Sequence, residues 1–171
     1  MVVTDEFHAW LAQVAPRDAH DPGIPVAGAD EWLRAMFERR GPISAEELDL
    51  EATEVAMQLA RDAVERFLRD LHATTDERPL IEIRQDDEYG VIVSYDGEYT
   101  TPAFLAMRDP EATCELADYL QTEVHRAIGR TWPTCHEHGA GLHAATDGVQ
   151  AIWSCHARGH QVAIIGELAG S

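Results

Sequence analysis

Apolar residues at spacings of three and four recur along much of the chain, and this period indicates amphipathic helices. The longest stretch predicts one helix over residues 44–73, where Ser44 and Glu47 form the capping-box pattern that starts a helix. Its apolar face comprises Leu48, Ala52, Val55, Leu59, Ala63, Phe67 and Leu71. A stripe of this length predicts the spine of the hydrophobic core.

The opposite face of this predicted helix carries charges of alternating sign. Two series of residues follow a spacing of four: Arg61, Glu65 and Arg69, and Asp62, Arg66 and Asp70. Oppositely charged side chains at this spacing are neighbours on a helix surface. We therefore expect both series to face solvent and to form ion pairs along the helix.

Three shorter helices are predicted by the same period, over residues 4–14, 31–40 and 109–128. In the last of these, Asp109 is placed to cap the helix, Pro110 to take its first position and Gly129 to end it. Residues 16–28 hold three Pro and two Gly, so they predict a loop or linker.

Alternation of apolar and polar positions predicts strands in the middle of the chain. Three strands are expected, over residues 80–85, 89–95 and 98–101. An acidic turn at 86–88 joins the first two, and the hairpin dipeptide Asp96-Gly97 leads to the third. Helices, a small antiparallel sheet and a closing helix together indicate an α+β fold for residues 1–131.

The last 40 residues differ in composition from the rest. Residues 132–171 hold two of the three Cys and five of the nine His, yet only one Arg. Three further strands are predicted, over 142–146, 149–154 and 161–165, with Asp147-Gly148 as a type I′ turn between the first two. We therefore expect an acidic α+β domain, residues 1–131, followed by a small β module, residues 132–171.

Two Cys–His pairs frame the first two of these strands. Cys135 and His138 have the spacing of a metal-binding knuckle, and Gly139 lets the chain fold back after them. Sixteen residues separate His138 from Cys155, and four separate Cys155 from His160. Two thiolates and two imidazoles are a ligand set that Zn²⁺ prefers.

In this order of knuckle, hairpin, knuckle and strand, the last 40 residues resemble the zinc-ribbon family in its form with two Cys and two His. The resemblance implies a closed, tetrahedral, structural Zn²⁺ held by Cys135, His138, Cys155 and His160. The tail also resembles those of small actinobacterial proteins, a likeness that implies no activity. Most ribbons use four Cys, and their second knuckle has a gap of two residues.

Alternatives to a bound zinc ion remain at this point. His136, His143 and His156 lie near the two pairs, so which histidines complete the site is open. A ribbon fold that has lost its metal is one alternative. Another is an unrelated fold in which the two cysteines are core thiols and the histidines lie on the surface.

Charge and composition exclude several function classes. The chain has 31 acidic residues against 13 Arg and no Lys, for a formal charge of −18. Nucleic acids and anionic membranes recruit basic segments, so neither is an expected partner. No apolar run reaches the length of a membrane span, and the N-terminus does not resemble a signal peptide. We therefore expect a cytoplasmic protein with reduced cysteines.

The sequence favours a non-enzymatic adaptor whose zinc-held module binds another protein. The second hypothesis is an acidic inhibitor or immunity-type protein that covers a basic site on a nuclease or DNA-binding partner. The third, a small metalloenzyme, is disfavoured because the H-E-x-x-H, G-x-S-x-G and phosphate-loop motifs are missing from the chain. The lone Cys114 predicts a helical thiol rather than a nucleophile. The oligomeric state is not indicated.

Overall fold

A computed structural model describes residues 3–14, 29–86, 90–99 and 107–169 of the protein. The described residues form helices α1 (Val3–Val14), α2 (Ala29–Arg40), α3 (Ala45–Thr74) and α4 (Asp109–Ile128), and strands β1 (Ile81–Asp86), β2 (Gly90–Tyr95), β3 (Glu98–Tyr99), β4 (Leu142–Thr146), β5 (Ala151–Cys155) and β6 (Gln161–Ile164). The predicted linker at 16–28, the turn residues 87–88 and the strand residues 89, 100 and 101 lie outside the described residues.

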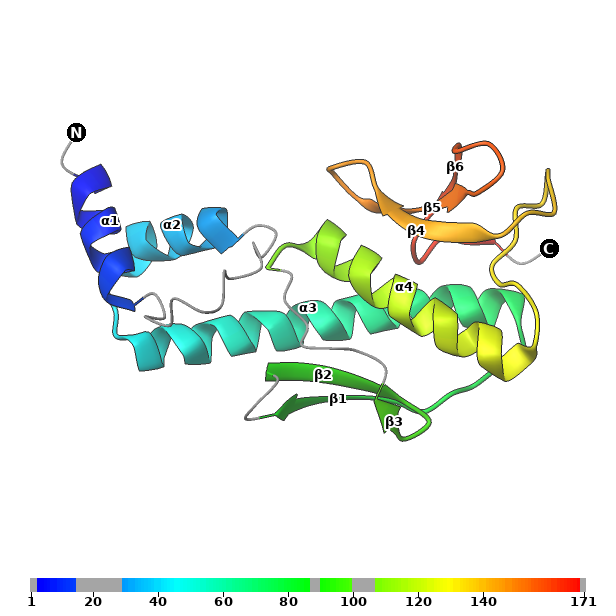
Figure 1. Ribbon diagram of the computed structural model, residues 1–171, viewed down its shortest axis with the longest axis horizontal. Coiled ribbons are helices and arrows are strands. Elements are labelled where there is room, and N and C mark those ends of the chain that lie inside the picture. The colour runs from blue at the N-terminus through cyan, green and yellow to red at the C-terminus, as the bar shows by residue number, and fades with distance from the viewer. Residues whose placement is uncertain (1–2, 15–28, 87–89, 100–106, 170–171) are drawn as a thin grey trace.

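Helix α3 runs through the middle of the molecule, between the sheet of β1 to β3 and the other elements (Figure 1). The antiparallel sheet β1-β2-β3 packs against one side of α3, and α4 packs beside α3. The second antiparallel sheet, β4-β5-β6, lies on α4. The predicted α+β class is therefore confirmed. No helix among the described residues has the length and apolar character that a membrane span requires.

The start of α3 agrees with the capping box read from the sequence. Ser44 Oγ accepts a hydrogen bond from the Glu47 backbone N–H at 3.2 Å, and Glu47 Oε2 accepts one from the Ser44 N–H at 3.0 Å. The two bonds satisfy N–H groups that a helix leaves without partners in its first turn. At about 1.5 Å per residue, the 30 residues of α3 make a helix that is long enough to contact all the remaining layers of the fold.

One buried apolar cluster joins α3, α4 and the two sheets. Phe67 of α3 meets the Trp132 ring edge-on at a centroid distance of 5.3 Å, and Trp132 meets Trp153 of β5 in the same way at 5.8 Å. The cluster includes residues on both sides of position 131, among them Leu116, Leu120, Val124, Leu142 and Ile165. The division into domains 1–131 and 132–171 stays a prediction.

A second, smaller apolar cluster holds the N-terminal helices together. Phe7 and Trp10 of α1 pack against Met36 and Phe37 of α2, as their spacing in the sequence predicts. The indole N–H of Trp10 donates a hydrogen bond to the Ile43 carbonyl at 2.7 Å, so the buried ring keeps a polar partner.

The prediction that Asp70 lies on the solvent face of α3 is wrong. Its side chain is fully buried on the same face as Phe67 and Leu71. Asp70 Oδ2 accepts hydrogen bonds from the indole N–H of Trp153 at 2.6 Å and the Gly166 N–H at 2.7 Å, and Oδ1 accepts one from the Leu168 N–H at 2.8 Å.

Burial raises the pKa of the Asp70 carboxyl above its usual range, while the three N–H donors and the charge of Arg69 act in the opposite direction. The expected Arg66–Asp70 pair is replaced by Arg66–Asp109, at 2.7 Å between Nη1 and Oδ1. The pair between Arg69 and Glu65 forms as predicted, at 3.0 Å.

The predicted cap of α4 is also wrong by one residue. Arg108 is the N-cap, without a side-chain capping bond, and Asp109 lies in the first turn. The Asp109 carboxylate instead accepts hydrogen bonds from Arg66 and from Thr113 Oγ1. The guanidinium of Arg66, on the neighbouring helix α3, thus binds the carboxylate that the local sequence predicted would cap α4. Gly129 ends α4 in the left-handed conformation, as predicted.

The hairpin between β4 and β5 is longer than the expected two-residue turn. Thr146 pairs with Ala151, so residues 147–150 form a four-residue connection. Asp147 Oδ1 accepts hydrogen bonds from the backbone N–H groups of Val149 and Gln150, at 2.8 and 2.9 Å. These bonds lower the pKa of the Asp147 carboxyl. An aspartate that bonds its own backbone favours this turn over the type I′ form.

Candidate metal centre

The first Cys–His pair lies on a tight turn that precedes β4. The Cys135 N–H donates to the Ala140 carbonyl at 2.7 Å, and the Gly139 N–H donates to the Cys135 carbonyl at 2.8 Å. Gly139 has a φ of 64°, a left-handed conformation that a residue with a Cβ adopts only at a cost. His138 is thereby placed one position before the glycine, with its ring beside the Cys135 thiol.

The second pair lies on a turn with the same backbone hydrogen bonds. The Cys155 N–H donates to the His160 carbonyl at 2.9 Å, and the Gly159 N–H donates to the Cys155 carbonyl at 2.7 Å. In both turns Cys is the first residue and Gly is the fifth. The fourth position, which is His138 in the first turn, is Arg158 in the second. The sixth position, His160, supplies the imidazole instead.

The β4–β5 ladder brings the two turns together. Leu142 is the register partner of Cys155, so the start of β4 lies beside the end of β5. The His156 N–H donates to the Gly141 carbonyl at 3.0 Å, and this bond joins the end of one turn to the start of the other. Residues separated by about 20 positions in the chain therefore face one another across the sheet end.

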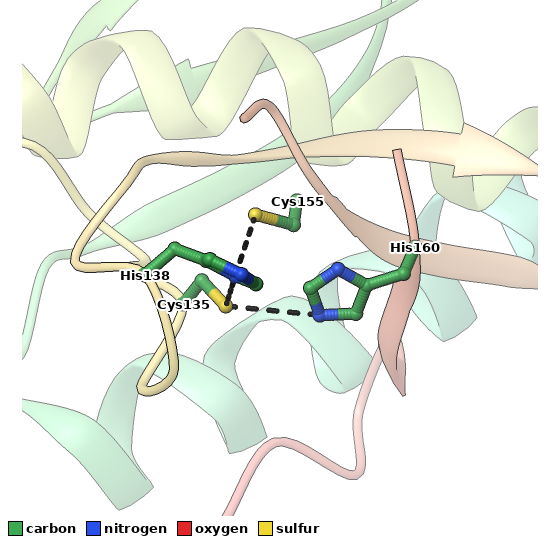
Figure 2. A group of neighbouring side chains, drawn as sticks. All are labelled: Cys135, His138, Cys155 and His160. Carbon is green, nitrogen blue, oxygen red and sulfur yellow. Dashed lines mark hydrogen bonds between the residues drawn. The ribbon is translucent and has the colours of Figure 1, made fainter. Parts of the chain in front are cut away.

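The four predicted ligands converge. One ligand atom from each of Cys135, His138, Cys155 and His160 lies within 4.8 Å of the others (Figure 2). Cys135 Sγ is 3.4 Å from His138 Nδ1 and 3.8 Å from His160 Nε2, and Cys155 Sγ is 3.7 Å from His138 Nδ1. In a tetrahedral zinc site, bond lengths of about 2.3 Å to sulfur and 2.0 Å to nitrogen put these atoms about 3.6 Å apart.

The site is buried on its sulfur side and open on its imidazole side. Cys135 and Cys155 are 1% and 0% exposed, whereas His138 is exposed and His160 half-buried. His160 Nε2 also lies 4.0 Å from a carboxylate oxygen of Glu137. Two buried thiols with two imidazoles above them can hold a metal ion, so the residues present fit the group that their spacing predicts.

The other three histidines lie outside this group. His136 has a 71% exposed side chain next to Glu137. The rings of His143 and His156 meet edge-on at a centroid distance of 5.8 Å. Within the part of the chain that the structure describes, only the predicted four form a set of metal-type ligands. Of the five histidines in this part of the chain, the described structure brings His138 and His160 together with the two cysteines.

The module that carries this site is anchored by polar residues that sequence reasoning did not select. Gln121 of α4 is buried, and its Nε2 donates to the carbonyls of Trp132 at 2.9 Å and Leu142 at 2.6 Å. His125 Nε2 also contacts the Trp132 carbonyl, and the Trp132 indole donates to Thr74 Oγ1 at 2.8 Å. Gln121 is one of many polar residues in α4, and no local motif distinguishes it from the others.

Cys114 does not belong to the site. It lies half-buried in α4, where burial and the charges of Asp118, Glu111 and Glu115 raise the pKa of its thiol. A raised pKa keeps the thiol protonated, and a protonated thiol is a poor nucleophile. This agrees with the sequence-based interpretation of Cys114 as a helical thiol.

Comparison with protein-family models, with curated proteins and with solved structures gives no match. The assignment of the site therefore rests on the geometry of the four side chains.

Proposed function

We propose that Cys135, His138, Cys155 and His160 bind one Zn²⁺ ion, and that the ion holds the C-terminal β module in its folded form. The observation that carries this proposal is the spacing of the ligand atoms. The three sulfur–nitrogen distances, 3.4 to 3.8 Å, match the edges of a zinc tetrahedron.

The chemistry of the ligands favours zinc over other metals. Hard cations such as Mg²⁺ and Ca²⁺ take oxygen ligands, whereas thiolate with imidazole in a tetrahedron is typical of zinc. Four protein ligands complete the tetrahedron and leave no position for water or substrate. A closed site of this kind supports a structural role, and we propose that the protein is not an enzyme.

The module needs a source of folding energy beyond its own core. Its strands are short, 4 or 5 residues each, and it is built around few large apolar side chains. A structural zinc contributes on the order of 10 kcal/mol in finger peptides. The ion would fix both turns, and the packing of Trp132 and Trp153 against α3 would attach the fixed module to the helices.

We further propose that the zinc-held module serves as a protein-binding surface in the cytoplasm. Its turns and hairpin present little charge compared with the helices: residues 132–171 contain three acidic residues and one Arg, out of 31 and 13 in the chain. A nearly uncharged face on an acidic protein suits a partner recognised by shape and apolar contact.

Metal content, measured by mass spectrometry on untagged protein, tests the zinc site. The wild type should carry one zinc per chain. Cys155→Ser should lose this zinc together with the near-ultraviolet circular dichroism signal of Trp153. Cys114→Ser is the matched control, since it removes the one cysteine outside the group and should keep the metal. A wild type without metal, or a Cys155→Ser protein that keeps it, would refute the proposal.

Substitution with Co²⁺ tests the ligand set. Thiolate ligands give cobalt intense charge-transfer absorption, and tetrahedral geometry gives strong d–d bands. We expect both in the wild type, a weaker charge-transfer band in any variant that retains cobalt with one thiolate, and no change in His136→Ala. A cobalt spectrum typical of octahedral oxygen ligands would contradict the assignment.

A further inference from the structure

Strand β1 is the edge of its sheet. The order β1-β2-β3 leaves one side of β1 without a neighbouring strand among the described residues, and β1 lies below β2 in the view of Figure 1. Its six residues, Ile81–Asp86, pair with β2 along their whole length. An edge of this length is a template for pairing with another strand.

The hydrogen bonds to β2 determine which backbone groups of β1 point outward. The Asp96 N–H donates to the Leu80 carbonyl at 2.8 Å, and the Leu80 N–H donates to the Asp96 carboxylate at 2.8 Å. Residues 80 and 96 are therefore a hydrogen-bonded pair, and such pairs alternate along an antiparallel ladder. Even-numbered residues of β1 thus bond to β2, and the N–H and C=O groups of Ile81, Ile83 and Gln85 point away from it.

The side chains of β1 divide between the two faces of the sheet. Ile81 and Ile83 are half-buried against the main apolar cluster. Glu82 and Arg84 lie on the other face and are exposed, Arg84 with 53% of its side chain and with Asp86 at 3.9 Å. The exposed face thus presents opposite charges two residues apart.

A second copy of β1 can pair with this edge in antiparallel orientation. The outward N–H and C=O groups of one copy must lie opposite the outward groups of the other copy. Symmetric pairing of residues 81, 83 and 85 therefore places the two-fold axis at residue 82, 83 or 84. An axis at Glu82 or at Arg84 places two like charges directly opposite each other. An axis at Ile83 places Glu82 opposite Arg84 of the second copy, twice, and pairs Ile81 with Gln85 of the second copy. The charges therefore select the axis at Ile83.

We propose that two copies of this chain associate through β1, which pairs with β1 of the second copy about a two-fold axis at Ile83 to form a continuous six-stranded sheet. The backbone ladder supplies the attraction, and the two Glu82–Arg84 pairs between copies supply the register. Charges on edge strands often prevent pairing, but they do so by repulsion. In this strand the alternating signs are complementary to their own two-fold copy.

Sedimentation velocity of the full chain, from about 5 to 500 μM at physiological salt, tests the proposal. The wild type should shift from monomer to dimer with concentration. Glu82→Arg and Arg84→Glu should each weaken the dimer at least about tenfold, because each turns two attractive cross-strand pairs into repulsive ones. The double variant Glu82→Arg/Arg84→Glu restores opposite charges and should return the dimerisation constant to near the wild-type value.

Two further variants separate the proposed edge from general effects. Glu98→Arg makes the same charge change on β3 of the same sheet and should leave dimerisation unchanged. Glu82→Arg makes the chain less acidic, so net repulsion alone would predict a stronger dimer, not a weaker one. Gln85→Pro removes an outward N–H without removing a bond to β2, and should abolish the dimer while thermal melting shows a folded protein.

Three results would overturn the proposal. The first is a wild type that stays monomeric over the whole concentration range. The second is a dimer whose constant is the same in the single charge variants. The third is a double variant that is as weak as the single ones.

Discussion

The buried carboxylate of Asp70 joins α3 to the C-terminal segment, and its removal is the sharpest test of how the fold is held. Asp70→Ala would take away the acceptor of three hydrogen bonds, from Trp153, Gly166 and Leu168. Trp153 and Gly166 are buried and Leu168 is half-buried, so water cannot easily replace the carboxylate. The donors would lose their partner in a place where a partner is required.

The structure allows the size of the effect to be worked out. A buried donor left without a partner costs about 1–3 kcal/mol, and the two buried donors with part of the third give about 4–6 kcal/mol. Burial of the Asp70 carboxylate has a desolvation cost, which is also what raises the pKa of this group. The alanine variant does not have this cost, so about 1–2 kcal/mol of the free energy of unfolding is regained. We therefore expect the free energy of unfolding to fall by about 2–5 kcal/mol, which corresponds to roughly 10 °C in melting temperature for a chain of this size.

Thermal and urea unfolding, monitored by tryptophan fluorescence and near-ultraviolet dichroism, measure this loss. Asp118→Ala on the exposed side of α4 is the matched control, because it makes the same change in a helix without removing a buried acceptor. Asp70→Asn keeps the side-chain volume but places an N–H₂ group, which cannot accept a hydrogen bond, opposite at least one donor. Its free energy of unfolding should fall by about 2 kcal/mol. An Asp70→Ala protein within 1 kcal/mol of the control would refute the reasoning.

Three more predictions concern the module and its metal. Gly159→Ala should weaken zinc binding about tenfold, measured by competition with a chelator, because the φ of 65° costs a residue with a Cβ about 1–2 kcal/mol and no nearby atom adds to that cost. Gln121→Ala should lower the free energy of unfolding by about 2 kcal/mol, since the carbonyls of Trp132 and Leu142 each lose a buried hydrogen bond; an unchanged melting curve would contradict this. Zinc binding should weaken as the pH falls, because thiolate and imidazole ligands bind the metal only in their deprotonated forms; a chromogenic chelator reports the released metal, and an affinity that does not change with pH would show that these are not the ligands.

Local pattern was enough to predict most of the helices and strands. The period of apolar residues predicted α1 to α4 within a few residues, and the Ser44–Glu47 capping box marked the start of α3. These features depend on neighbours within one or two turns of the chain. For the same reason the two Cys–His knuckles were recognisable, since each is a turn of six residues closed by its own hydrogen bonds.

Pattern failed where a partner comes from far along the chain. The charges around Asp70 suggested a solvated ladder, but 83 positions separate it from the Trp153 indole that it binds. The Asp109 carboxylate was assigned to a cap, but Arg66, 43 positions away, binds it. Neither contact has a local signature, because the packing of distant parts of the chain against α3 determines which side of the helix is buried.

By itself, therefore, the sequence determined the residue types and spacing of a candidate metal site, the positions of its turns and the acidic character of the chain. The tertiary structure decided which histidines accompany the two cysteines, because only pairing of β4 with β5 brings His138 and His160 to the same sulfur atom. It also decided that Asp70 and Gln121, unremarkable in the sequence, hold the module to the helices. Their partners lie far along the chain, and their hydrogen bonds are strong because packing excludes water from both partners.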